Sequence, residues 1–191
     1  ITAFKLYTYD SNGAVETLFD EFKIDYKRYK KLLSSEVIKI RVNRKSIFTD
    51  GIKIFKNFCK NLAKIEVSFV GDFGIGLGPT REFFTLFSHE LCYNQRKLFR
   101  SDTNEPKEIS QCKEGMFLSP QADPNLVEIL GIFIAKSIQT DVLIDINFNP
   151  YLFKFLRGEE VNIEFVDPML AQSLKHSEGL IGLPFTYPGL N

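Results

Sequence analysis

The sequence predicts an α+β fold that is dominated by helices and has only a few short strands. Three dipeptides place a side-chain acceptor immediately before a proline: Asp123-Pro124, Asn149-Pro150 and Asp167-Pro168. Each favours a helix start, because the side chain accepts a hydrogen bond from a free N–H group and proline loses none in the first turn. Residues 65–70 alternate apolar and polar side chains as a half-buried strand does, and residues 37–42 predict a strand or an extended lead-in. We expect no βαβ alternation and no internal repeat.

Apolar periodicity predicts the main helices. One starts near Ser46 and follows a single apolar face to Leu62, and a second covers residues 80–93. The helix that begins at Pro124 is apolar almost all round as far as Ala135, so we expect it to be the central, most buried helix. Weaker patterns predict helices over 25–33, 150–157 and 168–175 and strands over 116–118 and 183–187.

Composition excludes several classes of protein. The length of 191 residues suits one domain or two small ones. Lys plus Arg and Asp plus Glu each number 24, which argues against a dedicated nucleic-acid binder, because phosphate contacts demand a basic excess. No apolar run approaches the ~20 residues that span a bilayer, so we expect no membrane segment. Basic residues near the start predict a solvated surface or one that faces an acidic partner: Lys27, Arg28, Lys30, Lys31, Lys39, Arg41, Arg44 and Lys45.

A glycine-rich segment, residues 71–78, lies between a predicted strand and a predicted helix, where a phosphate-binding loop would be expected. Its glycine spacing is not that of a dinucleotide-binding loop, Pro79 lacks an N–H group, and no lysine stands where a P-loop needs one. Asp72-Phe73-Gly74 matches the kinase magnesium motif, but the other kinase motifs are absent. We expect a tight strand-to-helix turn that uses glycines with positive φ, with nucleotide binding as the alternative.

Side chains suited to catalysis or metal binding are sparse. Cys59, Cys92 and Cys112 are widely spaced, so we expect neither a disulfide framework nor a zinc site. Cys59 and Cys92 fall on or near apolar helix faces as small core residues do, and Cys112 falls in a polar loop without a neighbouring base. His89 and His176 have no second ligand at metal spacing. We expect no cofactor and no metal.

Several separated blocks of sequence resemble HECT-type ubiquitin ligases. The strongest, residues 76–91, reads Gly-Leu-Gly-Pro-Thr-Arg-Glu-Phe-Phe-Thr-Leu-Phe-Ser-His-Glu-Leu and is similar to the family signature in the subgroup that recognises ubiquitin-fusion substrates. Val42-Asn43-Arg44 precedes it in the family's order. The blocks that follow it in that order are 130–138, 143–148, 166–175 and 183–189. The resemblance covers about residues 40–191.

This resemblance implies a fold and a domain layout. It implies the helix-dominated large subdomain of the N-terminal lobe of a HECT domain over residues 40–182. Residues 183–191 would begin the small subdomain that docks the conjugating enzyme, and residues 1–39 would form a weakly matching N-terminal extension. The C-terminal lobe, which carries the cysteine that accepts ubiquitin, is expected to be absent. None of the three cysteines stands at a matching position, so no catalytic residue is carried over.

The family passes ubiquitin from a conjugating enzyme to a cysteine as a thioester and then to a substrate lysine. The resemblance therefore implies a ubiquitin transferase as the parent protein, with this chain inactive alone. It implies a conjugating enzyme, ubiquitin and protein substrates as partners, in the cytoplasm or nucleus. Leu98 and Phe99 are the candidate ubiquitin-binding surface, and a buried strand is the other interpretation of this pair. A non-catalytic ubiquitin-interaction domain is the alternative function.

Overall fold

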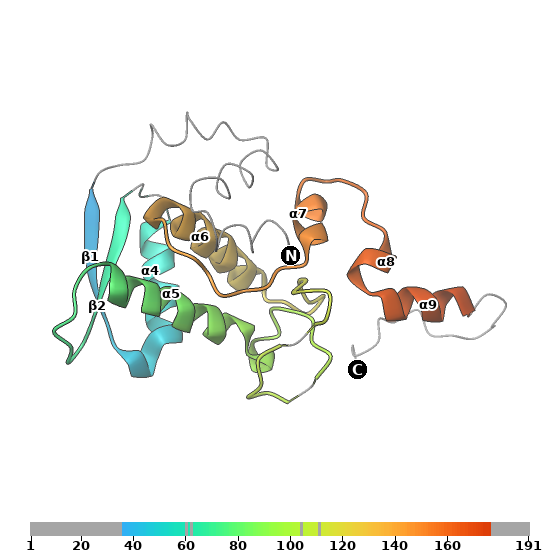
Figure 1. The fold of residues 1–191 in the computed structure, drawn as a ribbon, viewed down its shortest axis with the longest axis horizontal. Helices are drawn as coiled ribbons and strands as arrows, with labels where there is room; N and C mark the ends of the chain where they lie inside the picture. The colour runs from blue at the N-terminus through green and yellow to red at the C-terminus, as the bar shows by residue number, and fades with distance from the viewer. Residues whose placement is uncertain (1–35, 60, 62, 104, 111, 177–191) are drawn as a thin grey trace.

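The computed structural model describes residues 36–59, 61, 63–103, 105–110 and 112–176, and it is an α+β fold in which helices dominate, as predicted. A two-stranded sheet lies at one end, and helices cover it and extend to the other end (Figure 1). The elements in chain order are β1 (Val37–Val42), a 3-10 turn η1 (Arg44–Ser46), α4 (Ile47–Phe58), β2 (Lys64–Phe69), α5 (Leu77–Cys92), η2 (Asn94–Arg96), α6 (Pro124–Thr140), α7 (Pro150–Leu156), α8 (Ile163–Val166) and α9 (Pro168–His176).

The two strands are parallel, so β1, α4 and β2 form one βαβ unit. Val37 pairs with Lys64 and Val42 with Phe69, so the register covers both strands from end to end. This single unit was not predicted, although the described residues contain no repeated βαβ alternation. Parallel strands need a crossover of about a dozen residues or more, and α4 with its flanking turns supplies it. A single unit produces no repeated strand–helix pattern, so the sequence held no alternation to detect.

Phenylalanine rings from three helices form the centre of the core. Phe55 of α4 and Phe84 and Phe87 of α5 surround Phe133 of α6, with ring centroids 5.1–5.3 Å from that of Phe133. All four rings are fully buried, and Phe83 joins the group through Phe55 at 6.1 Å. These distances are those of favourable edge-to-face and offset contacts. The phenylalanine-rich composition therefore reflects a core in which α4, α5 and α6 share one aromatic cluster.

Helix α6 is central but is not buried all round. Leu126, Ile129 and Phe133 face the core, whereas Gly131 and Ala135 lie on an exposed side. The run of apolar residues therefore overstated the burial of this helix, because a helix packed on the core from one side still exposes part of its surface to solvent.

The three predicted helix starts are confirmed. The side chains of Asp123, Asn149 and Asp167 accept hydrogen bonds of 2.9 Å from N–H groups two or three residues further on. A fourth cap, Asn162, accepts from the Glu164 N–H at 3.1 Å and starts α8. Helix α8 was not predicted, because no proline follows Asn162.

Several expectations have other outcomes. Residues 116–118 form isolated bridges and no strand: Phe99 pairs with Leu118 and Met116 with Phe148. The predicted helix over 25–33 and the strand over 183–187 lie outside the described residues. So does the proposed start of the small subdomain. β1 crosses the predicted boundary between residues 39 and 40, and the domain boundaries themselves stay predictions. Among the helices of the described part of the chain, none combines the length and apolar character required to cross a bilayer.

Two helical glycines with opposite surroundings test this packing. A Cβ on Gly51 of α4 would lie 2.3 Å from the buried Phe87 ring, whereas a Cβ on Gly131 of α6 would meet no described atom within 4 Å. We expect Gly131→Ala to raise the free energy of unfolding by about 1 kcal/mol, because alanine is the better helix former. Gly51→Ala should lower it by about 1–3 kcal/mol through overpacking. Urea unfolding followed by circular dichroism measures both, and equal effects of the two substitutions would contradict the packing.

Candidate functional site

The candidate site is the junction where β2 turns into α5, because this is the segment that carries the strongest sequence signature. The backbone leaves β2, turns at Gly71 with φ of 91°, and enters α5 at Gly76 with φ of 86°. Both values are in the region that favours glycine. The expectation of a tight turn built on glycines with positive φ is confirmed.

Arg44, from the turn that follows β1, holds this loop in place. Its guanidinium forms an ion pair with Asp72 at 2.7 Å and a two-pronged contact with Glu82 of α5 at 2.7 and 3.0 Å. The guanidinium also lies 4.0 Å from the centroid of the Phe69 ring. The hydrogen bond from Arg44 holds the pKa of the Asp72 carboxyl below its usual range, although partial desolvation opposes this. One cation therefore ties the start of the loop to the first turns of α5.

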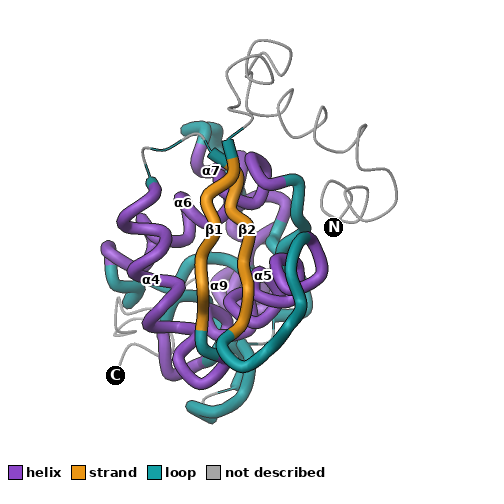
Figure 2. The backbone as a smooth tube through the Cα atoms, turned by 90° about the vertical axis from the view of Figure 1, so that its left-hand side faces the viewer, coloured by secondary structure: helices purple, strands orange, loops and turns teal. Residues whose placement is uncertain are grey.

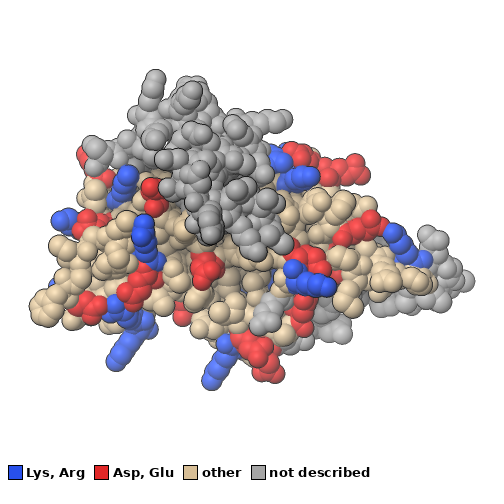
Figure 3. Space-filling view, viewed as in Figure 1, with Lys and Arg blue, Asp and Glu red and all other residues tan. Residues whose placement is uncertain are grey.

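The loop held in this way presents apolar side chains to solvent. Phe73 is fully exposed at 101% and Ile75 is 78% exposed, and Val70 and Leu77 are about half exposed. The loop projects at the lower left of Figure 1, and the corresponding part of the space-filling view is largely uncharged (Figure 3). Exposed apolar side chains on a fixed backbone are typical of a protein contact, and they are poorly suited to a phosphate.

Two threonines close the edge of β2 that faces away from β1. The Val67 N–H donates to Thr80 Oγ1 at 2.9 Å, and that hydroxyl donates to the Gly76 carbonyl at 2.8 Å. Further along the strand the Ile65 N–H donates to Thr140 Oγ1 at 3.3 Å. Thr80 belongs to α5 and Thr140 ends α6, so both helices are hydrogen-bonded to the strand that they cover. A buried N–H group without a partner costs roughly 1–3 kcal/mol, which is why these hydroxyls matter.

Lys136 of α6 fixes the loop between α4 and β2. Its side chain is 1% exposed, and Nζ donates to the Gln139 side chain at 2.7 Å, to the Ala63 carbonyl at 3.4 Å and to the Asn61 carbonyl. Burial lowers the pKa of this ammonium group. The three oxygen acceptors compensate for the loss of water. Lys136 is therefore a structural cation.

Leu98 and Phe99, the predicted ubiquitin-binding pair, lie in the core. They are 0% and 4% exposed, and the Leu98 carbonyl accepts from the Ser119 N–H at 2.9 Å. The Phe99 ring lies 6.1 Å from that of Phe148. Their burial favours the other interpretation, a buried extended segment. Contact between ubiquitin and these side chains stays a prediction without an exposed surface to support it.

The cysteines and histidines of the described residues do not cluster in one site. All three cysteines are free: Cys59 is exposed, Cys112 is half-buried, and Cys92 is buried. Burial, with a smaller contribution from the Asp145 charge, raises the pKa of Cys92 to about 12, and burial also raises that of Cys112. His89 contacts Asp145 at 2.8 Å, and this pair links α5 to the segment before α7. Within the described residues, no group of three His, Cys, Asp or Glu side chains could hold a metal ion.

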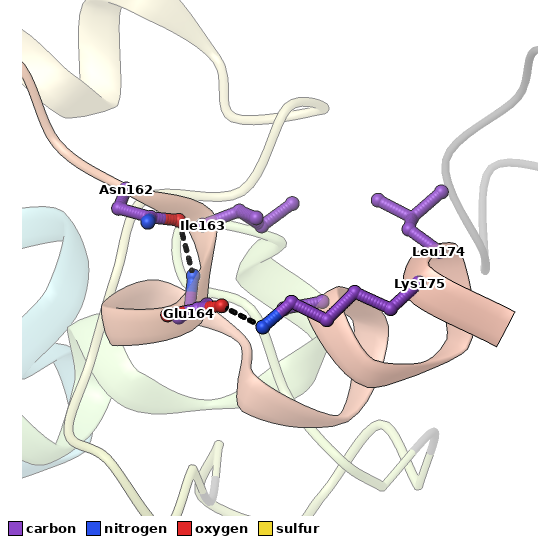
Figure 4. Close-up of a pocket in the computed structure, with 6 residues that line it drawn as sticks. Asn162, Ile163, Glu164, Leu174 and Lys175 are labelled. Atoms are coloured by element: carbon purple, nitrogen blue, oxygen red, sulfur yellow. Dashed lines mark hydrogen bonds and ion pairs between the residues drawn. The ribbon is translucent and has the colours of Figure 1, made fainter. Parts of the chain in front are cut away.

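A shallow hollow of about 330 Å³ lies between α8 and α9 (Figure 4). Ile163 and Leu174 form an apolar side of it, and Glu164 and Lys175 form an ion pair across it. Asn162 caps α8 with its side chain and Ala171 completes the lining. The hollow contains no nucleophile and its charges neutralise each other. Six exposed apolar side chains lie on α7, α8 and α9: Phe155, Leu156, Ile163, Phe165, Met169 and Leu174.

Comparison with known proteins gives these features a context. The model of the HECT-domain (ubiquitin-transferase) family matches residues 85–187, more than half of the chain. A probable ubiquitin fusion degradation protein of Schizosaccharomyces pombe is 32% identical over an alignment of 154 residues that covers 75% of this chain and 9% of the relative. Ubiquitin fusion degradation protein 4 of Saccharomyces cerevisiae is 25% identical over an alignment of 189 residues that covers 79% of this chain and 13% of the relative. E3 ubiquitin-protein ligase UPL3 of Arabidopsis thaliana is 26% identical over an alignment of 159 residues that covers 65% of this chain and 8% of the relative. The chain thus spans only a small part of each of these relatives.

Thr80 offers a direct test of the β2 edge. Thr80→Val removes the hydroxyl that accepts from Val67 and donates to Gly76, so we expect the free energy of unfolding to fall by about 2 kcal/mol. Thr80→Ser keeps the hydroxyl and should cost only about 0.8 kcal/mol for the lost methyl group. Urea unfolding of both variants measures the difference. If valine and serine were equivalent, the hydroxyl would not be holding the strand.

The three thiols should react with a disulfide reagent in the order of their accessibility. At pH 8 we expect Cys59 to react first, Cys112 more slowly, and Cys92 only when the chain unfolds, because burial hides its sulfur and its pKa of about 12 leaves little thiolate. Stopped-flow labelling with 5,5′-dithiobis(2-nitrobenzoate) on the Cys59→Ser and Cys112→Ser variants assigns each phase. Fast labelling of Cys92 in the folded chain would contradict the burial.

Proposed function

The chain belongs to the HECT-domain (ubiquitin-transferase) family, and from that membership we propose that it is part of a ubiquitin ligase. The parent protein would accept ubiquitin from a conjugating enzyme onto a cysteine as a thioester and then pass it to a substrate lysine. The observation that carries this proposal is the family match over more than half of the chain, together with relatives named as ubiquitin fusion degradation proteins and ubiquitin-protein ligases.

Within this reaction we propose that the described residues form a platform and do not supply the nucleophile. The properties of the thiols support this role. Burial raises the pKa values of Cys92 and Cys112, which disfavours the thiolate that the reaction needs. Cys59 is exposed at the end of α4, and Lys136, whose ammonium interacts with its charge, already donates hydrogen bonds to three oxygen acceptors. The chain alone would therefore be inactive.

We further propose that the partners are a conjugating enzyme, ubiquitin and protein substrates, in the cytoplasm or nucleus. Two exposed apolar surfaces support protein partners: the loop over 70–77 and the set on α7, α8 and α9. The free thiols are compatible with a reducing compartment. The alternative of a non-catalytic ubiquitin-binding domain gains no support from Leu98 and Phe99, because both are buried.

A thioester assay tests the proposed function. A conjugating enzyme loaded with fluorescent ubiquitin is mixed either with this chain or with the full-length product of the same gene. We expect a ubiquitin adduct that dithiothreitol removes on the full-length protein and none on this chain. An adduct on this chain that disappears in Cys59→Ser or Cys112→Ser would contradict the platform role. Absence of an adduct from both proteins, with an active conjugating enzyme, would contradict the ligase function.

A further inference from the structure

The outer edge of β1 has no hydrogen-bonding partner among the residues that the structure describes. The Lys64 N–H donates to the Glu36 carbonyl at 3.0 Å, and the Val70 N–H donates to the Val42 carbonyl at 2.9 Å. In a parallel ladder alternate residues bond to the neighbouring strand, so the even-numbered residues of β1 face β2. The N–H and C=O groups of Val37, Lys39 and Arg41 therefore point away from β2, and no described residue pairs with them.

This open edge contrasts with the other edge of the same sheet. There the N–H groups of Ile65 and Val67 are closed by the hydroxyls of Thr140 and Thr80. Figure 2 views the sheet face-on, with β1 and β2 in front of the helices. Side chains of α5 and α6 therefore close one edge of the sheet, whereas no described residue forms a hydrogen bond with the outer backbone groups of β1.

The side chains along β1 have a charge pattern that selects a partner. Lys39 and Arg41 are exposed on the same face, and neither forms an ion pair with a described residue. Ile38 and Ile40 are half-buried on the opposite face, and Ile40 packs against the core. An added strand would thus place every second side chain beside a cation and the others beside isoleucine, because side chains alternate between the faces of a sheet.

We propose that the outer edge of β1 binds an extended acidic peptide as a third strand, with acidic side chains beside Lys39 and Arg41 and apolar side chains beside Ile38 and Ile40. Backbone hydrogen bonds would supply affinity and the alternating side chains specificity, as in other cases of strand addition. Two copies of this edge would bring like charges together, which disfavours self-association. The edge contains neither a proline nor a bulge that would block pairing. The proposal does not depend on ubiquitin transfer.

Amide hydrogen exchange on the isotope-labelled chain tests the geometry of this proposal. The probe is an acetylated and amidated octapeptide of alternating glutamate and valine. We expect it to slow exchange at Val37, Lys39 and Arg41 and to leave Ile38 and Ile40, which already face β2, unchanged. Slowing at all five amides, or at none with the peptide at millimolar concentration, would overturn the proposal.

Charge reversal tests the selection of the partner. In the double variant Lys39→Glu, Arg41→Glu we expect binding of the acidic peptide to weaken about tenfold and binding of a lysine–valine octapeptide to appear. The matched control, Lys53→Glu with Lys56→Glu, makes the same change on the exposed side of α4 and should leave the affinity within about twofold. Equal losses in the two double variants would overturn the proposal, because they would indicate attraction to net charge alone.

The free chain provides the last arm of the test. We expect the amides of Val37, Lys39 and Arg41 to exchange fast before peptide is added. Slow exchange there would overturn the proposal, because another occupant would already cover the edge. Sedimentation velocity would then identify that occupant: a dimer indicates a second copy, and a monomer indicates another segment of the same chain.

Discussion

β2 is a buried strand that pairs with a single strand among the described residues, and the rest of this structure depends on how its second edge is closed. β2 pairs with β1 along one edge, and its other edge faces the helices, where the N–H groups of Ile65 and Val67 belong to buried residues and require a partner within the protein. The hydroxyls of Thr80 and Thr140 satisfy Val67 and Ile65, so the ends of α5 and α6 are fixed against the strand. Once these ends are fixed, the two helices and α4 can meet through the phenylalanine rings around Phe133.

The residues through which the chain resembles its family have structural roles in this arrangement. In the signature segment Thr80 closes the strand, Glu82 binds Arg44, and the phenylalanines fill the core. Lys136, in the later block, ties α6 to the loop before β2. Asp167 caps α9 and forms an ion pair with Arg100. These residues therefore build the scaffold of this chain, and this agrees with the proposal that the chemistry is performed elsewhere in the parent protein.

Local signals made part of this structure predictable from sequence. Asp123, Asn149 and Asp167 act on N–H groups two or three residues away, and their helix starts were predicted correctly. Thr80 and Lys136 form hydrogen bonds with residues that are 13 and about 75 positions away in the sequence, and no local sequence pattern predicts contacts at such separations. Burial of Leu98 and the parallel pairing of β1 are likewise products of the tertiary fold. The glycine turn was predictable because its geometry is local, whereas the Arg44 clamp that holds it was not.

Native-state hydrogen exchange at Ile65 and Val67 in increasing urea tests most directly whether Thr140 and Thr80 close the edge of β2. If the threonines hold the closed edge as part of the core, both amides exchange only when the whole chain unfolds. Their exchange free energies should then equal the global free energy of unfolding and fall with urea at the same slope. Exchange of either amide through a local opening would show an exchange free energy below that of global unfolding and little dependence on urea. This result would contradict the claim that the threonine hydroxyls hold this edge as part of the core.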